Sequence, residues 1–236
     1  MRILLWGNGE RGIQILESLL RSSHTIVGIV SSATDSKFVE TAKSHGLDVI
    51  TSETPNSLPP LDRLRDLNAE VFVLAGYGLI LDSSTIMLPP KGAINLHGGK
   101  LPEFRGSSPM NWALIRGDTK FSISLISMKP GIDTGDIVAE MEFPIAENDT
   151  IADLHQNANV AFCDMLENVL ARLEQDMLQK HRQKESFSAY YPRRFPDDGL
   201  VFFDQLSALE IHNKIRALTL PYPCAFTLYQ GARVKL

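Results

Sequence analysis

The chain has 236 residues, of which 44% are hydrophobic and 22% are charged, and its formal net charge is −5. A chain of this length and composition is expected to bury one large core, with room for a small appendage. The negative net charge argues against a general affinity for nucleic-acid phosphates, which requires clustered lysine and arginine side chains.

The cysteine count and the short apolar runs disfavour secreted and membrane proteins. Only Cys163 and Cys224 occur, without metal-ligand spacing, so a disulfide framework is excluded and a reducing compartment fits best. Residues 2–7 are too short for a signal peptide, and no apolar run approaches the ~18 residues that span a bilayer. We therefore expect a cytoplasmic protein with no metal site and no membrane partner.

Short apolar runs alternate with amphipathic segments over the N-terminal part of the chain. This alternation predicts a Rossmann-like α/β fold, with a mostly parallel sheet and helices on both of its faces. Ligands of such sheets gather at the carboxyl ends of the strands. The predicted strands are residues 3–6, 25–30, 49–50, 71–74 and 93–95, and the predicted helices are 13–20 and 37–44.

A strand pair and a long helix follow. Strands at residues 121–126 and 137–143 flank a turn that contains glycines, and the pair lets this turn fold back towards the carboxyl edge of the sheet. Apolar residues spaced by three or four positions predict a helix over 151–173. Residues 179–185 are interpreted as its solvated end, with cations near the negative pole of the helix.

The composition changes at residue 187, after which aromatic and proline residues are frequent. A helix is predicted at 208–218 and strands at 224–229 and 233–236. We therefore expect a catalytic domain over residues 1–186 and a small C-terminal α+β subdomain over residues 187–236.

A Gly-x-Gly-x-x-Gly run at residues 7–12 follows the first predicted strand directly. Such glycines let a backbone approach a phosphate at a helix N-terminus. A dinucleotide site also needs an acidic residue at the end of the second strand, where this chain has Ser31 and Ser32 and where Asp35 comes late. Contact with an anion or a sugar nucleotide is therefore favoured over NAD or FAD, with a purely structural turn as the alternative. The candidate contacts are Gly7, Asn8, Gly9 and Arg11.

The loop that closes the fourth predicted strand is a second candidate site. Its glycines suit a loop that offers main-chain donors and acceptors to a flat heterocycle, and an ordinary strand-to-helix turn explains them equally well. The residues concerned are Tyr77, Gly78, Leu79, Ile80 and Leu81.

Asn95 and His97 end a predicted core strand, and their spacing of two places both side chains on one face. A lone histidine is usually structural, but its position at a strand's carboxyl end, before Gly98 and Gly99, favours catalysis. Asp133 lies between glycines in the later turn and, taken alone, fits a turn residue or a catalytic acid equally well. An amide, an imidazole and a carboxylate together suit acyl transfer to an amine.

Three motifs give these residues a family context. They are Asn-x-His-Gly-Gly-x-Leu-Pro-x-Phe-Arg-Gly at 95–106, Trp-Ala-Leu-Ile-Arg-Gly-Asp at 112–118 and Gly-Ile-Asp-Thr-Gly-Asp-Ile at 131–137. Their combination resembles the 10-formyltetrahydrofolate-dependent formyltransferases. The resemblance implies N10-formyltetrahydrofolate as co-substrate and Asn95, His97 and Asp133 as catalytic residues. It also implies a pterin-holding loop from Tyr77 to Leu81, with further backbone contacts from Pro130 and Gly131.

Three branches of this family are candidates. Enzymes that formylate methionyl-tRNA carry a longer, basic C-terminal domain, whereas residues 187–236 hold six Lys or Arg against four Asp or Glu. Glycinamide ribonucleotide formyltransferases commonly have His-Pro-Ser where this chain has His-Gly-Gly. The His-Gly-Gly start and the Pro-Tyr-Pro of residues 221–223 look most like enzymes that N-formylate nucleotide-linked amino sugars.

The resemblance thus implies formyl transfer to the amine of a nucleotide-linked amino sugar, by likeness a dTDP-4-amino-4,6-dideoxyhexose. The alternatives are glycinamide ribonucleotide or methionyl-tRNA formylation, and a non-catalytic Rossmann-like nucleotide-binding module. Small-molecule substrates are the expected partners, with no nucleic acid bound. The chain ends where relatives often continue a strand or hairpin used for dimerisation, so the sequence leaves open whether the protein forms a homodimer.

The implied mechanism is direct transfer from the folate nitrogen to the sugar amine. Asn95 donates a hydrogen bond to the developing oxyanion, with His97 beside it as a second donor. Asp133 favours the imidazolium form of His97 and, through water, helps to take a proton from the amine. Arg105 is expected to order the loop or the substrate, and Tyr222 to contact the substrate.

Overall fold

The computed structural model describes residues 1–32, 36–57 and 60–236, so Asp35 lies outside the described residues. The described chain forms two compact units. The first unit comprises Met1–His97, Ser124–Ala139 and Asn159–Gln183, and the second comprises Gly98–Ile123, Glu140–Ala158 and Lys184–Leu236. Because the units interleave along the chain, a single domain boundary between residues 186 and 187 stays a prediction.

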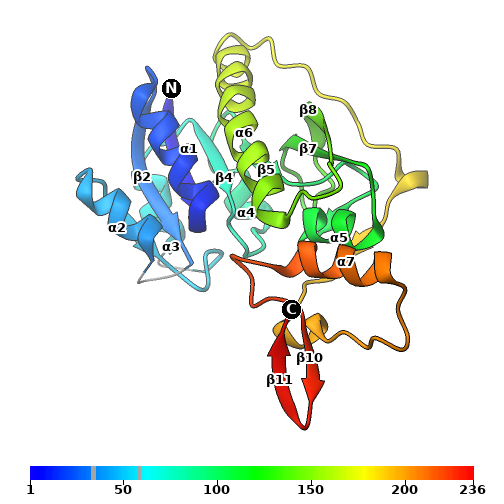
Figure 1. Ribbon diagram of the computed structural model, residues 1–236. Helices are drawn as coiled ribbons and strands as arrows, with labels where there is room; N and C mark the ends of the chain where they lie inside the picture. Colours follow the sequence, from blue (N-terminus) through cyan, green and yellow to red (C-terminus); the bar gives the residue numbers. More distant parts are fainter. Residues whose placement is uncertain (33–35, 58–59) are drawn as a thin grey trace. The chain divides into compact units, whose positions relative to one another are not determined.

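A seven-stranded sheet has the strand order β3-β2-β1-β4-β5-β7-β8 (Figure 1). Neighbouring strands from β3 to β5 pair in parallel, and β7 pairs antiparallel to β5. The predicted mostly parallel sheet is therefore confirmed. The strands are Arg2–Gly7 (β1), Thr25–Ser31 (β2), Val49–Thr51 (β3), Val71–Ala75 (β4), Ala93–His97 (β5), Lys120–Ser127 (β7) and Asp136–Pro144 (β8).

Strand β1 explains why helices cover both faces of the sheet. Its residues 3–6 are all fully buried, as expected for a central parallel strand. Leu4 and Trp6 point to one face, where they pack in a cluster with Leu61 and Leu64 of α3 (Pro60–Asp66). Helix α1 (Gly9–Arg21) contacts β1, β2 and β4.

The remaining helices of this fold differ in how well the sequence predicts them. Helix α2 (Lys37–Ser44) begins where the sequence predicts, and Ser36 Oγ accepts a hydrogen bond from Val39 N at 3.3 Å to cap it. Helix α6 (Ile151–Glu174) is the predicted long helix. Helices α3 and α4 (Ser83–Ile86) are missing from the sequence prediction because each is too short to show a helical period.

The segment after α6 corrects one sequence interpretation. The helix ends at Glu174, and residues 179–185 are not its solvated end. His181 forms an antiparallel bridge with Ile137, and the Gln183 side chain is only 6% exposed. Residues 179–183 therefore belong to the first unit, and the run of charged residues around Gln183 gives no sign that its side chain is buried.

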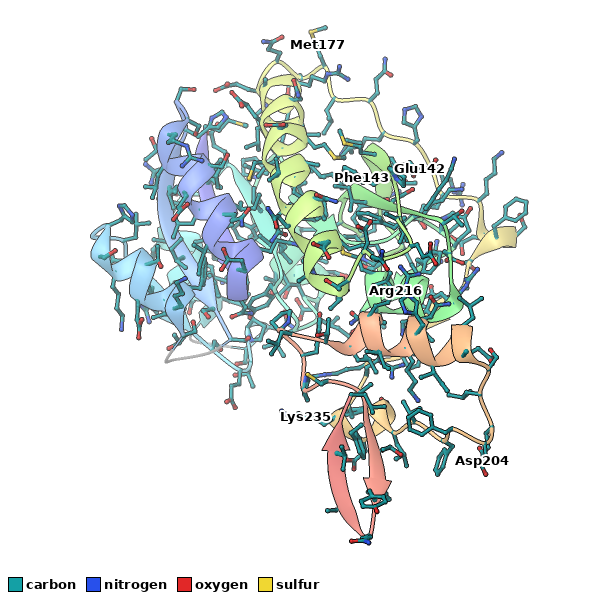
Figure 2. The ribbon with its side chains drawn as sticks, in the orientation of Figure 1. Glu142, Phe143, Met177, Asp204, Arg216 and Lys235 are labelled. Carbon is teal, nitrogen blue, oxygen red and sulfur yellow. The ribbon has the colours of Figure 1, made fainter. Side chains whose placement is uncertain are left out.

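The second unit is organised around two helices, α5 and α7, which pack against each other. A capping box starts α7, because Ser207 Oγ accepts from Glu210 N and the Glu210 carboxylate accepts from Ser207 N. Arg216 of α7, labelled in Figure 2, donates to the carbonyls of Ala146 and Asp149, both at 3.1 Å. The elements of this part are Arg105–Gly106 (β6), Pro109–Arg116 (α5), Glu185–Phe187 (η1), Tyr190–Tyr191 (β9), Pro196–Gly199 (η2), Ala208–Leu218 (α7), Phe226–Tyr229 (β10) and Ala232–Lys235 (β11).

Two small two-stranded sheets complete the second unit. Strand β6 pairs in parallel with β9, and β10 pairs antiparallel to β11 as a hairpin. The C-terminal helix and hairpin confirm the small C-terminal α+β region that the sequence predicts.

Candidate active site

The strand order sets a topological switch point in the first unit. Strand β1 lies between β2 and β4, so the loops that leave β1 and β4 meet at a topological switch point. Asn8 N donates to the carbonyl of Ala75 at 3.2 Å. Gly76 has a φ of +72°, and a Cβ added there would lie 2.9 Å from the Asn8 carbonyl oxygen. Only glycine permits this close approach of the two loops.

The structure brings His97 and Asp133 together at the neighbouring strand end. Asn95 and His97 lie on β5, with His97 the last residue of the strand. His97 is 6% exposed, and its Nδ1 lies 3.5 Å from Asp133 Oδ2. Asp133 comes from the turn between β7 and β8, and its φ is +52°. The predicted proximity of the imidazole and the carboxylate is therefore confirmed, while their catalytic roles stay predictions.

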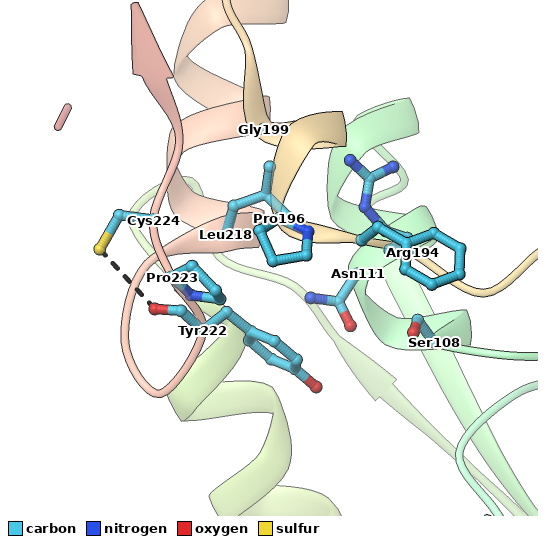
Figure 3. Close-up of a pocket in the computed structure, with 10 residues that line it drawn as sticks. Ser108, Asn111, Arg194, Pro196, Gly199, Leu218, Tyr222, Pro223 and Cys224 are labelled. Atoms are coloured by element: carbon cyan, nitrogen blue, oxygen red, sulfur yellow. Dashed lines mark hydrogen bonds between the residues drawn. The ribbon is translucent and has the colours of Figure 1, made fainter. Parts of the chain in front are cut away.

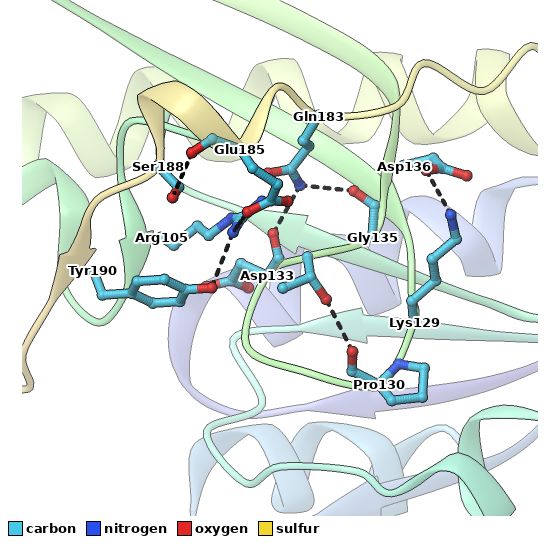
Figure 4. A network of polar contacts seen from close by, with 11 residues as sticks. Arg105, Lys129, Pro130, Asp133, Gly135, Asp136, Gln183, Glu185, Ser188 and Tyr190 are labelled. Atoms are coloured by element: carbon cyan, nitrogen blue, oxygen red, sulfur yellow. Dashed lines mark hydrogen bonds and ion pairs between the residues drawn. The ribbon is translucent and has the colours of Figure 1, made fainter.

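Four polar contacts hold the Asp133 turn (Figure 4). Thr134 Oγ1 donates to the Pro130 carbonyl at 3.0 Å, and the Lys129 ammonium lies 2.7 Å from the Asp136 carboxylate. The Gln183 amide donates to main-chain carbonyls within the turn. Sequence reasoning missed Gln183, because no motif marks a residue whose partners are main-chain atoms.

The loop after β4 combines a buried start with an exposed middle. The Tyr77 ring packs edge-on against Trp6 with 5.2 Å between ring centroids, and burial raises the pKa of Tyr77 to about 12. Asn56 fixes the far end, since its amide donates to the Ile80 carbonyl at 2.9 Å. Gly78 is exposed, and the Ile80 side chain is 65% exposed. The loop thus offers main-chain groups and an apolar side chain to a ligand.

Comparison with known proteins decides the family. The formyl transferase model matches residues 1–170, and the model of the formyl transferase C-terminal domain matches residues 195–236. The chain belongs to the formyl transferase family. It is accordingly a folate-dependent N-formyltransferase, and its formyl donor is N10-formyltetrahydrofolate.

Individual relatives differ in their acceptors. The chain is 32% identical to the methionyl-tRNA formyltransferase of Alkaliphilus oremlandii, over all of this chain and 79% of that protein. A sugar N-formyltransferase from Shewanella sp. has a TM-score of 0.82 at 22% identity, covering 100% of this chain and 96% of that one. An N-formyltransferase from Helicobacter canadensis, solved with folinic acid and dTDP-3-aminofucose, has a TM-score of 0.74 at 19% identity, covering 98% and 85%. The two structures show the shared fold.

The glycine turn after β1 is largely explained by contacts within the enzyme. A Cβ on Gly7 would lie 2.6 Å from Phe38 Cζ. The Asn8 side chain donates to Ser32 Oγ at 3.0 Å and accepts from Ser31 Oγ at 2.8 Å. These contacts account for Gly7 and Asn8 as structural residues, so that substrate contact by Gly7, Asn8 or Gly9 stays a prediction.

The Arg11 side chain also has partners inside the first unit. Its Nε donates to Asn159 Oδ1 at 3.1 Å, and its guanidinium lies 4.8 Å from the centre of the Phe162 ring. Both partners belong to α6. These contacts tie α1 to α6, and a substrate contact by Arg11 stays a prediction.

Arg105, in the second unit, is almost fully buried, with 1% of its side chain exposed. Its two terminal nitrogens donate to the two Glu185 oxygens at 2.9 and 2.8 Å, and one also donates to the Tyr190 hydroxyl at 2.9 Å. The bond to Glu185 raises the pKa of Arg105. The guanidinium therefore orders the β6 loop, and a substrate contact stays a prediction.

Tyr222 lines a pocket of about 90 Å³ that lies within the second unit (Figure 3). Its hydroxyl lies 3.0 Å from His155 Nε2. Arg194 contributes a half-buried guanidinium stacked over the Trp112 ring at 4.7 Å, and burial lowers its pKa. The other lining residues are Ser108, Asn111, Phe195, Pro196, Gly199, Leu218, Pro223 and Cys224.

The described residues contain neither a metal-ligand cluster nor a membrane-spanning helix. Within residues 1–32, 36–57 and 60–236, three or more His, Cys, Asp or Glu side chains nowhere gather in a way that could hold a metal ion. In the same residues, every helix is too short or too polar to cross a membrane.

Proposed function

We propose that the enzyme transfers the formyl group of N10-formyltetrahydrofolate to the amine of a nucleotide-linked amino sugar, specifically a dTDP-4-amino-4,6-dideoxyhexose. The observation that carries this proposal is the Tyr222 pocket. Its volume of about 90 Å³ is well below the ~300–1,000 Å³ of pockets that enclose whole ligands. A pocket of this size suits one ring of a larger molecule, and we assign it to the pyrimidine base.

The lining of the pocket supports a flat heterocycle. Tyr222, Phe195 and the two prolines supply apolar faces, and base–aromatic stacking contributes ~1–3 kcal/mol per base. Polar groups lie beside them, because Asn111 and Arg194 also line the pocket. The Arg194 Nε is buried and has no hydrogen-bond partner among the described protein atoms. An acceptor atom on the base edge would satisfy this donor.

The cations of the C-terminal region argue against a tRNA acceptor. Arg216 donates to two main-chain carbonyls, Arg233 pairs with Asp197 at 2.6 Å, and Lys214 donates to the Leu200 carbonyl. Arg194 donates to the Asp198 carbonyl at 3.0 Å. Four of the six cationic side chains in residues 187–236 are thus directed at protein acceptors. Binding to a phosphate backbone requires cations that are clustered and available.

The chemistry in this proposal is supplied by the catalytic trio, which consists of Asn95 and His97 on β5 and Asp133 on the turn between β7 and β8. The Asn95 amide donates to the oxyanion that develops on the formyl carbon, and removing such a donor typically costs ~10²–10³ in turnover. Asp133 Oδ2, 3.5 Å from His97 Nδ1, orients the imidazole, which lies beside the amide as the second polar group at the oxyanion. Through water, Asp133 also helps to remove the proton that the attacking amine loses.

The donor site in this proposal combines two loops of the first unit. The main chain of Gly78 and the exposed Ile80 fit a flat, partly apolar pterin, and Tyr77 and Leu81 anchor that loop in the core. The second loop contains Pro130 and Gly131, and its Ile132 side chain is 46% exposed. Each loop exposes one isoleucine beside main-chain hydrogen-bond donors. This combination favours a ligand that has an apolar surface and polar edges.

Methionyl-tRNA formylation is the second candidate, because the curated relative at 32% identity carries that activity in its name. The discriminating experiment offers the purified chain N10-formyltetrahydrofolate with three acceptors in parallel. These are a dTDP-4-amino-4,6-dideoxyhexose, methionyl-tRNA and glycinamide ribonucleotide, with formylated product measured by mass spectrometry. A higher kcat/KM for methionyl-tRNA than for the nucleotide sugar would refute the proposal.

A substitution in the pocket tests the assignment of the base. Tyr222→Ala is expected to raise KM for the nucleotide sugar about 10- to 100-fold, because stacking on the base is lost. The KM for the folate donor should stay within about 2-fold of wild type. Tyr229→Ala is the matched control, since this tyrosine is 66% exposed on β10 and lines no part of the pocket. Equal effects of both substitutions would contradict the assignment.

We also propose a homodimer. The β10–β11 hairpin is a separate two-stranded sheet, and two-stranded sheets are marginally stable alone. Its apolar side chains are exposed, with Leu228 at 54% and Val234 at 43%. Pairing with the hairpin of a second copy would cover them and extend the sheet. Sedimentation equilibrium of the chain and of Leu228→Lys tests this, and a monomeric wild-type chain would refute it.

A further inference from the structure

One buried amide serves the turn that carries Asp133. The Gln183 Nε2 donates to the carbonyl oxygen of Asp133 and to that of Gly135, both at 2.7 Å (Figure 4). The Gln183 side chain is 6% exposed. A single amide group therefore uses both of its hydrogens on one turn of main chain, and we refer to these two hydrogen bonds as the Gln183 clamp.

The segment that carries Gln183 is itself held in a fixed register. His181 and Ile137 exchange two main-chain hydrogen bonds, each of 2.8 Å, in an antiparallel bridge. In an antiparallel pair the two chains run in opposite directions. The residue two positions after His181 therefore lies opposite the residue two positions before Ile137, which places Gln183 opposite Gly135. Lys180 Nζ adds a bond to Ser127 Oγ at 3.0 Å. The bridge at His181 therefore orients the Gln183 side chain towards the turn.

The turn has features that make an external clamp necessary. Asp133 has a φ of +52°, in the left-handed region that non-glycine residues rarely adopt. Gly131 has a φ of +112°, and a Cβ on Gly135 would lie 2.3 Å from the Ser127 carbonyl oxygen. Such backbone persists only when its surroundings over-determine it. The two carbonyls that Gln183 engages flank Thr134, so the clamp restrains the main chain on both sides of that residue.

We propose that Gln183 is a positioning residue, which fixes the Asp133 carboxylate opposite His97 by holding the main chain of the turn. This inference rests on the catalytic role of Asp133 in the proposed function. Gln183 touches carbonyl oxygens of the turn and acts on the reaction through Asp133. A misplacement of about 1 Å in a catalytic group can lower turnover ~10²-fold, which sets the scale of the expected effect.

The test is a double-mutant cycle in the full chain, run with whichever acceptor the wild-type enzyme formylates. Gln183→Met keeps the length of the side chain and removes both donors. We expect kcat to fall about 10- to 100-fold, with KM for donor and acceptor within about 2-fold of wild type. In the Asp133→Asn background, the same substitution should lower kcat by less than about 2-fold, because its route of action is already lost.

Two further variants keep the test decisive. Gln183→Glu has the same size, loses both donors when ionised, and replaces Gln183→Met if that protein fails to fold. Gln179→Met is the matched control, because Gln179 is exposed in the same segment, and its kcat should equal that of wild type.

The outcomes separate the two proposals. Unchanged turnover in Asp133→Asn would overturn the catalytic trio and, with it, the role of Gln183. A large loss in Asp133→Asn, together with more than half of wild-type kcat in both folded Gln183 variants, would overturn the clamp alone. Equal losses from Gln183→Met in both backgrounds would show a general structural role and would also overturn it.

Discussion

Two glycine-rich turns of the first unit look alike in sequence and differ in what they contact. The first turn, residues 7–12, runs from the end of β1 into the start of α1. Its glycines pack on a neighbouring ring, since Cβ atoms on Gly7 and Gly12 would lie 2.6 and 3.0 Å from Phe38. The turn between β7 and β8, residues 131–136, uses its glycines to bend back towards β5. It places the Asp133 carboxylate 3.5 Å from the His97 ring.

The side chains within the two turns show the same contrast. In the first turn, Asn8 bonds to Ser31 and Ser32, so its amide serves to join β1 to β2. In the second turn, main-chain carbonyls are bonded by Gln183, which leaves the Asp133 carboxylate directed at an imidazole. A glycine motif at a strand end therefore indicates that the main chain closely approaches a neighbouring part of the protein. Whether it indicates chemistry depends on where the intervening side chain points.

The largest expected effect lies in the second turn. Asp133→Asn should lower kcat by about 10²–10³-fold, because the carboxylate that orients the His97 ring and receives a proton is lost. Its thermal stability should change little, since the amide has the same size. Steady-state kinetics at saturating donor and acceptor measure this loss.

Asp136→Asn is the matched control within the same turn. Asp136 pairs with Lys129 at 2.7 Å, and about half of the Lys129 side chain is exposed. The Asp136 side chain is 17% exposed, but its partner lies in solvent, so the pair contributes only ~1 kcal/mol and most of the activity should remain. If the two asparagine variants lose activity equally, the contrast between Asp133 and its neighbours is wrong.

A smaller effect, on stability, should follow from the first turn. Gly7→Ala forces a methyl group against the buried Phe38 ring, and overpacking of this kind costs ~1–3 kcal/mol. We expect a Tm lowered by several degrees and kcat within about 2-fold of wild type. Phe38→Leu in the same chain should make the double variant more stable than the sum of the two single effects.

Gly9→Ala separates packing from backbone strain. Gly9 has a φ of +59°, and an added Cβ would meet no atom within 4 Å. The strain costs ~1–2 kcal/mol, and Phe38→Leu should not restore the stability lost in Gly9→Ala.

A rise in acceptor KM with an unchanged Tm in Gly7→Ala would instead support the phosphate-contact interpretation of this turn.

The same contrast explains how far the sequence predicts the structure. Strand alternation and strand-end position are local patterns that the sequence displays, and they predict Asn95 and His97. Asp133 taken alone fits a turn residue equally well, and its assignment to the site comes from the family resemblance. The antiparallel insertion of β7 beside β5 depends on pairing between segments far apart in the chain, which composition does not encode. Gln183 was missed for a related reason. It stands among charged residues, and its partners are main-chain carbonyls that any residue type supplies.

The smallest expected effect concerns Tyr77, in the loop that adjoins the first turn. Its hydroxyl is buried without a hydrogen-bond partner among the described protein atoms, and burial raises its pKa to about 12. Between pH 10 and pH 12 the unfolded chain loses this proton and the folded chain keeps it, so the tyrosine lowers stability as pH rises.

Tyr77→Phe removes that contribution. At pH 8, the free energy of unfolding of this variant in urea should lie between the wild-type value and ~1 kcal/mol above it. Above pH 10, it should fall less steeply with pH than the wild-type value. An equal alkaline slope in both proteins would show that Tyr77 is not the titrating group. A raised KM for the folate donor would show that its hydroxyl contacts the ligand.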